Sequence, residues 1–95
     1  MKHQRQFATE SGVASKEAAE QIRMLITDLV DTVQILDANI AAEEERAHVH
    51  DLSDADYPAL ARMLDTRRRN LMVTIASLED RLGSIEKMRS REHCR

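Results

Sequence analysis

The sequence predicts an all-α fold: an antiparallel two-helix hairpin of coiled-coil type that dimerises into a four-helix bundle. Residues that favour helices dominate the 95 residues, whereas the chain has only two glycines, one proline and 2% aromatic residues. Two long stretches carry aliphatic residues at alternating steps of three and four. A short segment without this period separates them, which indicates two helices and one turn.

The first helix is expected over residues 16–47. Its apolar residues fall on heptad positions a and d and form one seam, interrupted only by Glu43: Ala19, Ile22, Ile26, Leu29, Val33, Leu36, Ile40 and Ala47. Ser15 has the side chain of an N-cap residue, whose hydroxyl accepts from the free amides of the first turn. Residues 1–14 have no period, so we expect a flexible N-terminal arm.

The turn is expected over residues 48–56, which are rich in side chains that bond their own backbone. Ser53 and Asp56 have capping-box spacing, and Pro58 suits only the first turn of a helix. The second helix is therefore expected over residues 57–89, with a flexible tail at 91–95. Its seam is Tyr57, Ala61, Leu64, Arg68, Leu71, Ile75, Leu78, Leu82 and Ile85.

The two seams match when the chain folds back on itself. Residues at equal sequence distance from Leu52 pair an a position of one helix with a d position of the other. The pairs are Ile40 with Leu64, Leu36 with Arg68, Val33 with Leu71, Leu29 with Ile75, Ile26 with Leu78, Ile22 with Leu82 and Ala19 with Ile85. Because the midpoint falls inside the predicted turn, the pattern favours an antiparallel hairpin.

A second apolar set lies outside the seam and is the predicted interaction surface. It comprises Leu25, Thr32, Ile35, Leu60, Met63, Met72, Val73 and Ala76. A hairpin of this size buries a small core, so we expect these residues to pack against a second copy in a homodimer. The alternatives are scattered surface residues, or a surface covered by the N-terminal arm through Phe7 and Val13.

Four arginines are the most conspicuous charged group. Arg68 occupies a seam position beside Asp37 in the predicted register. We expect Arg68 to pair with Asp37, or alternatively with Glu44, and its charge to set the register. Arg62, Arg67 and Arg69 form a candidate patch for an anion or nucleic acid. The formal net charge of −3 and the lack of interleaved aromatic residues argue against nucleic acid as the main partner.

The sequence predicts no catalytic site, cofactor or functional metal site, because no motif groups a nucleophile, a base and an orienting residue. Glu45 and His48 have a spacing that binds metals in some helical bundles, but their heptad positions face outward. His48, His50 and Asp51 can bind zinc or nickel adventitiously.

A cytoplasmic location is the expectation from two further features. No apolar run has the length of a membrane span, and the N-terminus lacks the apolar core of a secretory signal. The lone cysteine, Cys94, excludes an intramolecular disulfide.

These observations predict a non-enzymatic protein–protein interaction module, a small regulatory or adaptor protein that acts through a helical-bundle surface. The alternative is a nucleic-acid-associated regulator that uses Arg62, Arg67 and Arg69. The partners expected are a second copy of the chain and another protein, with no membrane association.

Overall fold

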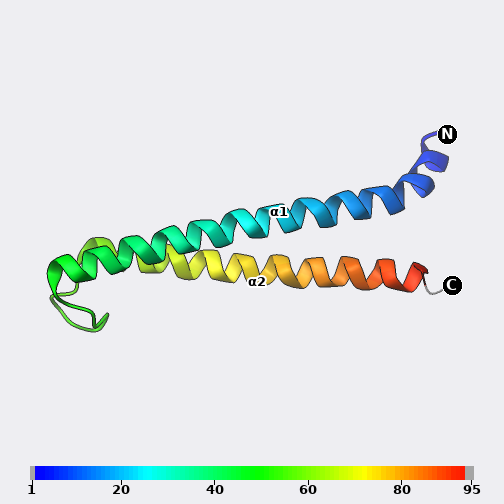
Figure 1. The fold of residues 1–95 in the computed structure, drawn as a ribbon. Helices are drawn as coiled ribbons and strands as arrows, with labels where there is room; N and C mark the ends of the chain where they lie inside the picture. The colour runs from blue at the N-terminus through cyan, green and yellow to red at the C-terminus, as the bar shows by residue number, and fades with distance from the viewer. Residues whose placement is uncertain (1, 94–95) are drawn as a thin grey trace. The chain divides into compact units, whose positions relative to one another are not determined.

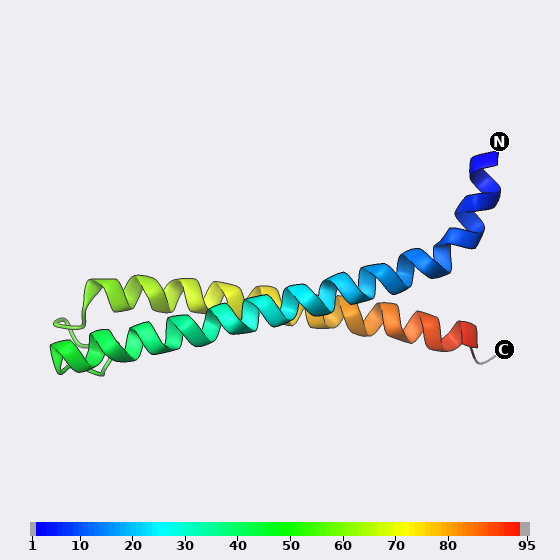
Figure 2. The same cartoon turned by 45° about the horizontal axis from the view of Figure 1, so that its top comes forward.

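The computed structural model describes the backbone of residues 2–93 and the side chains of residues 14–90. It is all-α, with helix α1 over Lys2–Ala47 and helix α2 over Ala59–His93. The helices form an antiparallel hairpin, joined by residues 48–58 (Figures 1 and 2). The predicted all-α class and antiparallel hairpin are confirmed, whereas dimerisation into a four-helix bundle stays a prediction. Neither described helix combines the length and apolar character needed to cross a membrane.

The chain divides into two units, each built from segments of both helices. Residues 28–75 form the turn unit, which contains the connection between the helices. Residues 1–27 and 76–95 form the terminal unit. The ion pair between Arg68 and Asp37 joins the helices within the turn unit, and the pair between Arg23 and Glu86 joins them within the terminal unit.

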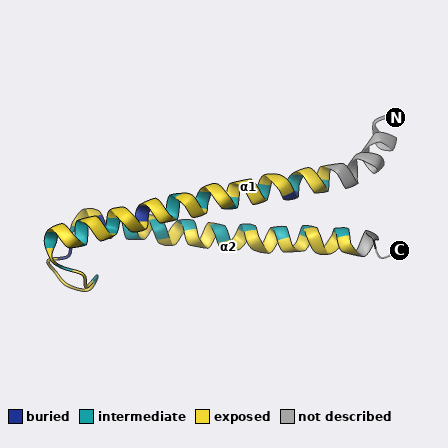
Figure 3. Ribbon diagram, in the orientation of Figure 1, coloured by how far each residue is buried: buried dark blue, intermediate teal, exposed yellow. Residues whose placement is uncertain are grey.

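The predicted seam is the covered face of each helix. Every seam position from Ala19 to Ala47 and from Tyr57 to Ile85 is buried or half-buried (Figure 3). Among the described side chains only Ala19, Leu36, Tyr57 and Ala61 count as buried, and no large one is fully enclosed. Two helices cover each other along one face only, so the seam remains partly open to water.

Helix α1 begins earlier than the sequence suggested. It starts at Lys2, so the expected start at residue 16 is wrong and Ser15 lies inside the helix, half-buried. The physical reason is that residues 2–15 contain no proline, and Gly12 weakens a helix by only about 1 kcal/mol relative to alanine. The predicted flexibility of residues 1–14 and 91–95 stays a prediction. The side chains of Phe7, Val13 and Cys94 lie outside the described residues.

Helix α2 begins later than expected. Pro58 precedes its first residue, Ala59, and the Pro58 carbonyl accepts from the Arg62 amide at 3.0 Å, so Pro58 is the N-cap residue. The capping box predicted for Ser53 and Asp56 is absent, because both residues bond within the connection instead. The helix continues through Gly83 and past residue 89 to His93.

The connection begins at His48, whose backbone conformation ends helix α1. This residue has φ of 58°, the left-handed conformation that glycine normally supplies after a helix. Its amide donates to the Glu45 carbonyl at 3.3 Å, and the Val49 amide donates to the Glu44 carbonyl at 3.2 Å. These two bonds form a Schellman motif, which satisfies carbonyls at the end of α1.

Two aspartates then fold the rest of the connection. The Asp51 carboxylate accepts from the Ser53 amide at 3.0 Å and from the Ser53 hydroxyl at 2.7 Å. The Asp54 carboxylate accepts from the Asp56 amide at 2.9 Å, in the same kind of Asx turn. The bonds from Ser53 hold the pKa of the Asp51 carboxyl below its ordinary value. A connection at the predicted turn is therefore confirmed, although it spans residues 48–58 and not 48–56.

The strained conformation of His48 leads to a stability prediction. His48→Gly should raise the free energy of unfolding by about 1 kcal/mol, because glycine removes a steric penalty of about 1–2 kcal/mol while adding some entropy to the unfolded chain. Urea denaturation followed by circular dichroism measures the change. His48→Ala is the control, since it keeps the Cβ atom. A glycine variant no more stable than the alanine variant would contradict the prediction.

Candidate interaction surface

In the turn unit, large apolar side chains stand open to water. Ile35 on α1 is 60% exposed, and Met63 and Val73 on α2 are 70% and 67% exposed. Leu60 and Met72 are about half exposed. All five belong to the interaction surface predicted from the sequence. A single exposed apolar side chain is common on a protein surface, so these five residues remain candidates for a binding surface.

The other predicted surface residues differ in their exposure. Leu25 and Ala76, in the terminal unit, are exposed. Thr32 is half-buried, and its hydroxyl donates to the Asp28 carbonyl at 3.0 Å, so it has little free surface for a partner.

Three further apolar side chains were missed from the sequence. Met24 and Met88, in the terminal unit, are 68% and 64% exposed, and Val30 in the turn unit is 36% exposed. All three stand outside the a and d positions. A census of every apolar residue off the seam would have found them.

The terminal unit carries a shallow groove of about 320 Å³ between its two helix segments. Its walls are Ala18, Gln21, Ile22 and Leu25 from α1 and Leu78, Arg81 and Ile85 from α2. Most of these side chains are apolar, and Arg81 supplies the one charge among them. The groove therefore suits an apolar side chain that is accompanied by a negative charge.

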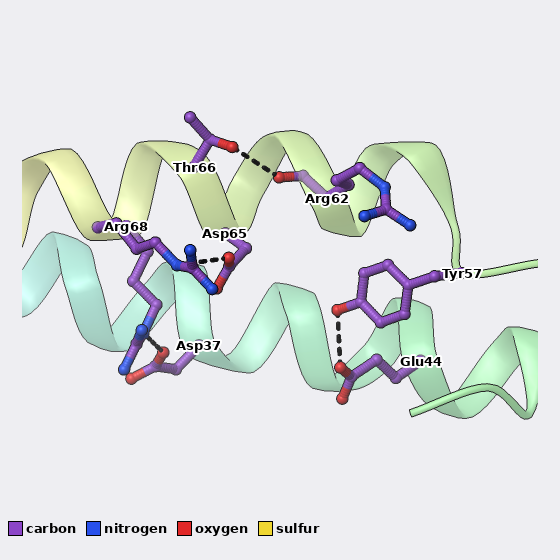
Figure 4. Close-up of polar contacts among 8 residues, drawn as sticks. Asp37, Glu44, Tyr57, Arg62, Asp65, Thr66 and Arg68 are labelled. Atoms are coloured by element: carbon purple, nitrogen blue, oxygen red, sulfur yellow. Dashed lines mark hydrogen bonds and ion pairs between the residues drawn. The ribbon is translucent and has the colours of Figure 1, made fainter. Parts of the chain in front are cut away.

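A second hollow, in the turn unit, surrounds the start of α2. Its walls are Ala55, Tyr57, Ala59, Arg62, Met63 and Thr66. The Tyr57 hydroxyl donates to Glu44 at 2.7 Å, and the Arg62 guanidinium lies 5.4 Å from the centre of the Tyr57 ring (Figure 4). Arg62 also donates to the Asp54 carbonyl at 3.3 Å. Tyr57 thus ties the start of α2 to the end of α1.

Burial and the negative charge of Glu44 raise the pKa of Tyr57 to about 12. Burial is the larger cause, because it disfavours the phenolate. The native state therefore holds the phenol proton more tightly than the unfolded chain does. The stability that depends on the protonated phenol is complete below pH 10 and declines as the pH rises towards 12.

The candidate arginine patch does not form one surface. Arg67 lies five residues after Arg62 and two before Arg69, which places it on a different flank of α2. Arg62 is engaged with Tyr57, and Arg69 pairs with Asp65 at 2.9 Å. Binding of an anion or nucleic acid by these arginines stays a prediction.

Arg68 lies at the seam and contacts the other helix. It is about one-third exposed, and its Nε donates to the Asp37 carboxylate at 2.5 Å (Figure 4). The predicted register brings these two residues to the same level of the hairpin. That the pair sets the register stays a prediction.

His50, in the turn, lies near two acidic side chains. His50 Nδ1 is 3.7 Å from Glu44 Oε1, and His50 Nε2 is 4.0 Å from Glu45 Oε2. Within the described residues, no three His, Cys, Asp or Glu side chains are grouped closely enough to hold a metal ion.

Comparisons with protein-family models, curated proteins and solved structures give no match to this chain.

The bond between Tyr57 and Glu44 leads to the second prediction. Tyr57→Phe should lower the free energy of unfolding by about 1–2 kcal/mol at neutral pH, because it removes a hydrogen bond to a carboxylate. The variant should also lose the part of the stability decline between pH 10 and 12 that comes from the phenol. Denaturation at a series of pH values measures both effects. Ultraviolet absorbance of the single tyrosine gives its pKa directly, and an ordinary value near 10 would contradict the prediction.

The pair between Arg68 and Asp37 leads to the third prediction. Arg68→Leu should keep or raise the melting temperature, since an apolar residue at a seam position packs without the desolvation of a charge. Arg69→Leu is the matched control, because Arg69 makes a similar ion pair off the seam. A marked fall in melting temperature for Arg68→Leu alone would show that the ion pair is a net source of stability.

Proposed function

We propose that this chain is a non-enzymatic protein-interaction module that acts through the apolar surface its hairpin leaves uncovered. The first partner is a second copy, with which it forms a four-helix bundle. The bundle then acts as a small regulatory or adaptor protein by occupying the surface of another protein.

The main support is the amount of surface that the chain exposes. Its accessible area is 7636 Å², whereas a compact monomer of 10.8 kDa exposes about 5,500 Å². The difference is larger than the roughly 800 Å² that each partner buries in a standard interface. A second hairpin laid over the open seam would cover such an area.

The chemistry of the exposed surface points the same way. The groove of the terminal unit and the hollow of the turn unit are lined mainly by apolar or aliphatic side chains. Apolar contact is the principal driving force of helix-bundle association in water. The nucleic-acid alternative has weaker support, because Arg62 and Arg69 are already engaged within the chain.

Light scattering coupled to size-exclusion chromatography tests the proposal and gives the fourth prediction. The wild-type chain should have twice its monomer mass at micromolar concentration. Ile35→Asp with Met63→Asp should raise the dissociation constant by at least about tenfold, because each places a charge in a surface that the dimer covers.

Gln34→Asp with Asn70→Asp is the matched control, since both residues are exposed, polar and next to or near the apolar surface. A folded wild-type monomer, or an equal effect of both double variants, would refute the homodimer. Binding to DNA or RNA that weakens with salt and with Arg62→Glu and Arg69→Glu would favour the alternative function.

A further inference from the structure

We infer that the turn units of two copies associate side by side with their connections at the same end, so that α1 of each copy packs against α2 of the other. This inference rests on the proposed homodimer and adds its geometry. It concerns the turn unit alone, residues 28–75, all of whose side chains are described. Two observations carry it: the opposite charges of the two helices in this unit, and one flank of the unit that is almost free of charge.

The two helices of the turn unit differ in the sign of their charge. On α1, residues 28–47 contain six acidic residues and one arginine, a formal net charge of −5. On α2, residues 59–75 contain four arginines and one aspartate, a formal net charge of +3. A dimer that places α1 beside α1 and α2 beside α2 brings like charges together, whereas one that places α1 beside α2 brings opposite charges together. The charges therefore favour α2 of the second copy as the neighbour of α1.

The turn unit has two flanks, one on each side of the seam, and polar contacts cross one of them. Asp37 and Glu44 are seven residues apart on α1, so they lie on the same flank. Asp37 accepts a hydrogen bond from Arg68. Glu44 accepts one from Tyr57, whose ring lies beside the Arg62 guanidinium (Figure 4). Covering these charged groups with a second copy would cost desolvation free energy, so this flank is the poorer contact surface.

The opposite flank carries few charges. In an antiparallel pair of heptad helices the e positions of both helices, which include Asp37 and Glu44, lie on one flank and the g positions on the other. The g and c positions in the turn unit between residues 32 and 74 form this second flank: Thr32, Ile35, Asn39, Ala42, Arg46, Leu60, Met63, Arg67, Asn70 and Thr74. Arg46 and Arg67 are the only charged residues among them, and Ile35 and Met63 are 60% and 70% exposed. This flank is therefore the one that a second copy covers most favourably.

Two-fold symmetry then determines which residues meet. When the symmetry axis runs parallel to the helices, every residue of the second copy keeps the height it has in the first, and each contact occurs twice. In the predicted register, residues at equal sequence distance from Leu52 are level, so Ala42 is level with residue 62 and Ile35 with residue 69. Ala42 of one copy therefore meets Met63 of the second copy, and Ile35 meets Asn70.

Side-chain size is complementary at these contacts. Ala42 is small and exposed, whereas Leu60 and Met63 are large and are 51% and 70% exposed. Further from the connection the sizes are reversed, since Ile35 on α1 is larger than Asn70 on α2. Each helix thus has small side chains at the height where its neighbour in the second copy has large ones, which allows the two helices to pack closely.

Disulfide formation between single-cysteine variants tests the arrangement. The variants are made in a Cys94→Ser background, so each protein has one thiol and every disulfide joins two copies. Ala42→Cys mixed with Met63→Cys, and Ile35→Cys mixed with Asn70→Cys, should each give a mixed disulfide on mild oxidation. The two thiols of each mixture differ in height by only about 1.5 Å, the rise of one helical residue.

The two crossed mixtures are the matched controls, because they use the same four proteins. Ala42→Cys with Asn70→Cys, and Ile35→Cys with Met63→Cys, place the thiols at heights that differ by roughly 9–12 Å. A disulfide joins Cα atoms no more than about 7 Å apart, so the crossed mixtures should yield about tenfold less mixed disulfide. Mass spectrometry identifies the mixed species, and circular dichroism checks that each variant keeps its helices.

The outcomes separate this arrangement from the proposed function. Mixed disulfides in both matched mixtures, in large excess over the crossed mixtures, support the packing of α1 against α2 of the second copy. A dimer that gives equal yields in all four mixtures, no mixed disulfide, or disulfides only between identical positions overturns the arrangement and leaves the homodimer intact. A wild-type chain that is monomeric overturns both.

Discussion

The structure depends on one constraint: two helices can cover each other along a single face. The seam from Ala19 to Ala47 and from Tyr57 to Ile85 uses that face fully, since every seam position is buried or half-buried. Yet among the described side chains only those of Ala19 and Ala61 are fully closed off from water, and Leu36 and Tyr57 come close to it. The aliphatic residues that supply the driving force therefore release only part of their hydrophobic free energy within one chain. Association is the direct way to release the rest.

The connection between the helices shows how the chain turns without glycine. His48 takes the left-handed conformation, and the Schellman hydrogen bonds at Glu44 and Glu45 hold it there. The carboxylates of Asp51 and Asp54 accept hydrogen bonds from the backbone amides two residues later, which would otherwise need a backbone carbonyl as partner. The Tyr57 hydroxyl donates to Glu44. The last turn of α1 therefore both accepts the Schellman hydrogen bonds and holds the start of α2 in place. Local chemistry thus fixes the reversal of the chain, while the seam fixes the pairing of the two helices.

The hairpin was predictable because its seam residues recur regularly along both helices and each facing pair indicates the same turn. Seven facing pairs agree on one midpoint at Leu52, so an error at any single residue would not have changed the result. The ends of the helices depend instead on one or two residues each. Ser15 has an N-cap side chain, but the helix passes through it, since no proline precedes it and Gly12 opposes helix formation only weakly. The strained φ of His48 arises from its place after Ala47 in the folded chain and has no marker in the residue type. The contact between Arg68 and Asp37 followed from the register, and the exposure of Met24 and Met88 could have been predicted from their heptad positions off the seam.

The seam and the exposed apolar surface contain different types of residue. The seam contains leucine, isoleucine, valine and alanine but no methionine. The four methionines whose side chains are described all lie off the seam and are exposed: Met24, Met63, Met72 and Met88. Branched side chains have few rotamers and specify one register, while methionine adapts its shape to different neighbours. A chain built this way keeps the packing inside each hairpin fixed and allows the outer surface to adjust. This division agrees with the proposed function, in which a fixed hairpin would meet its partners through a deformable surface.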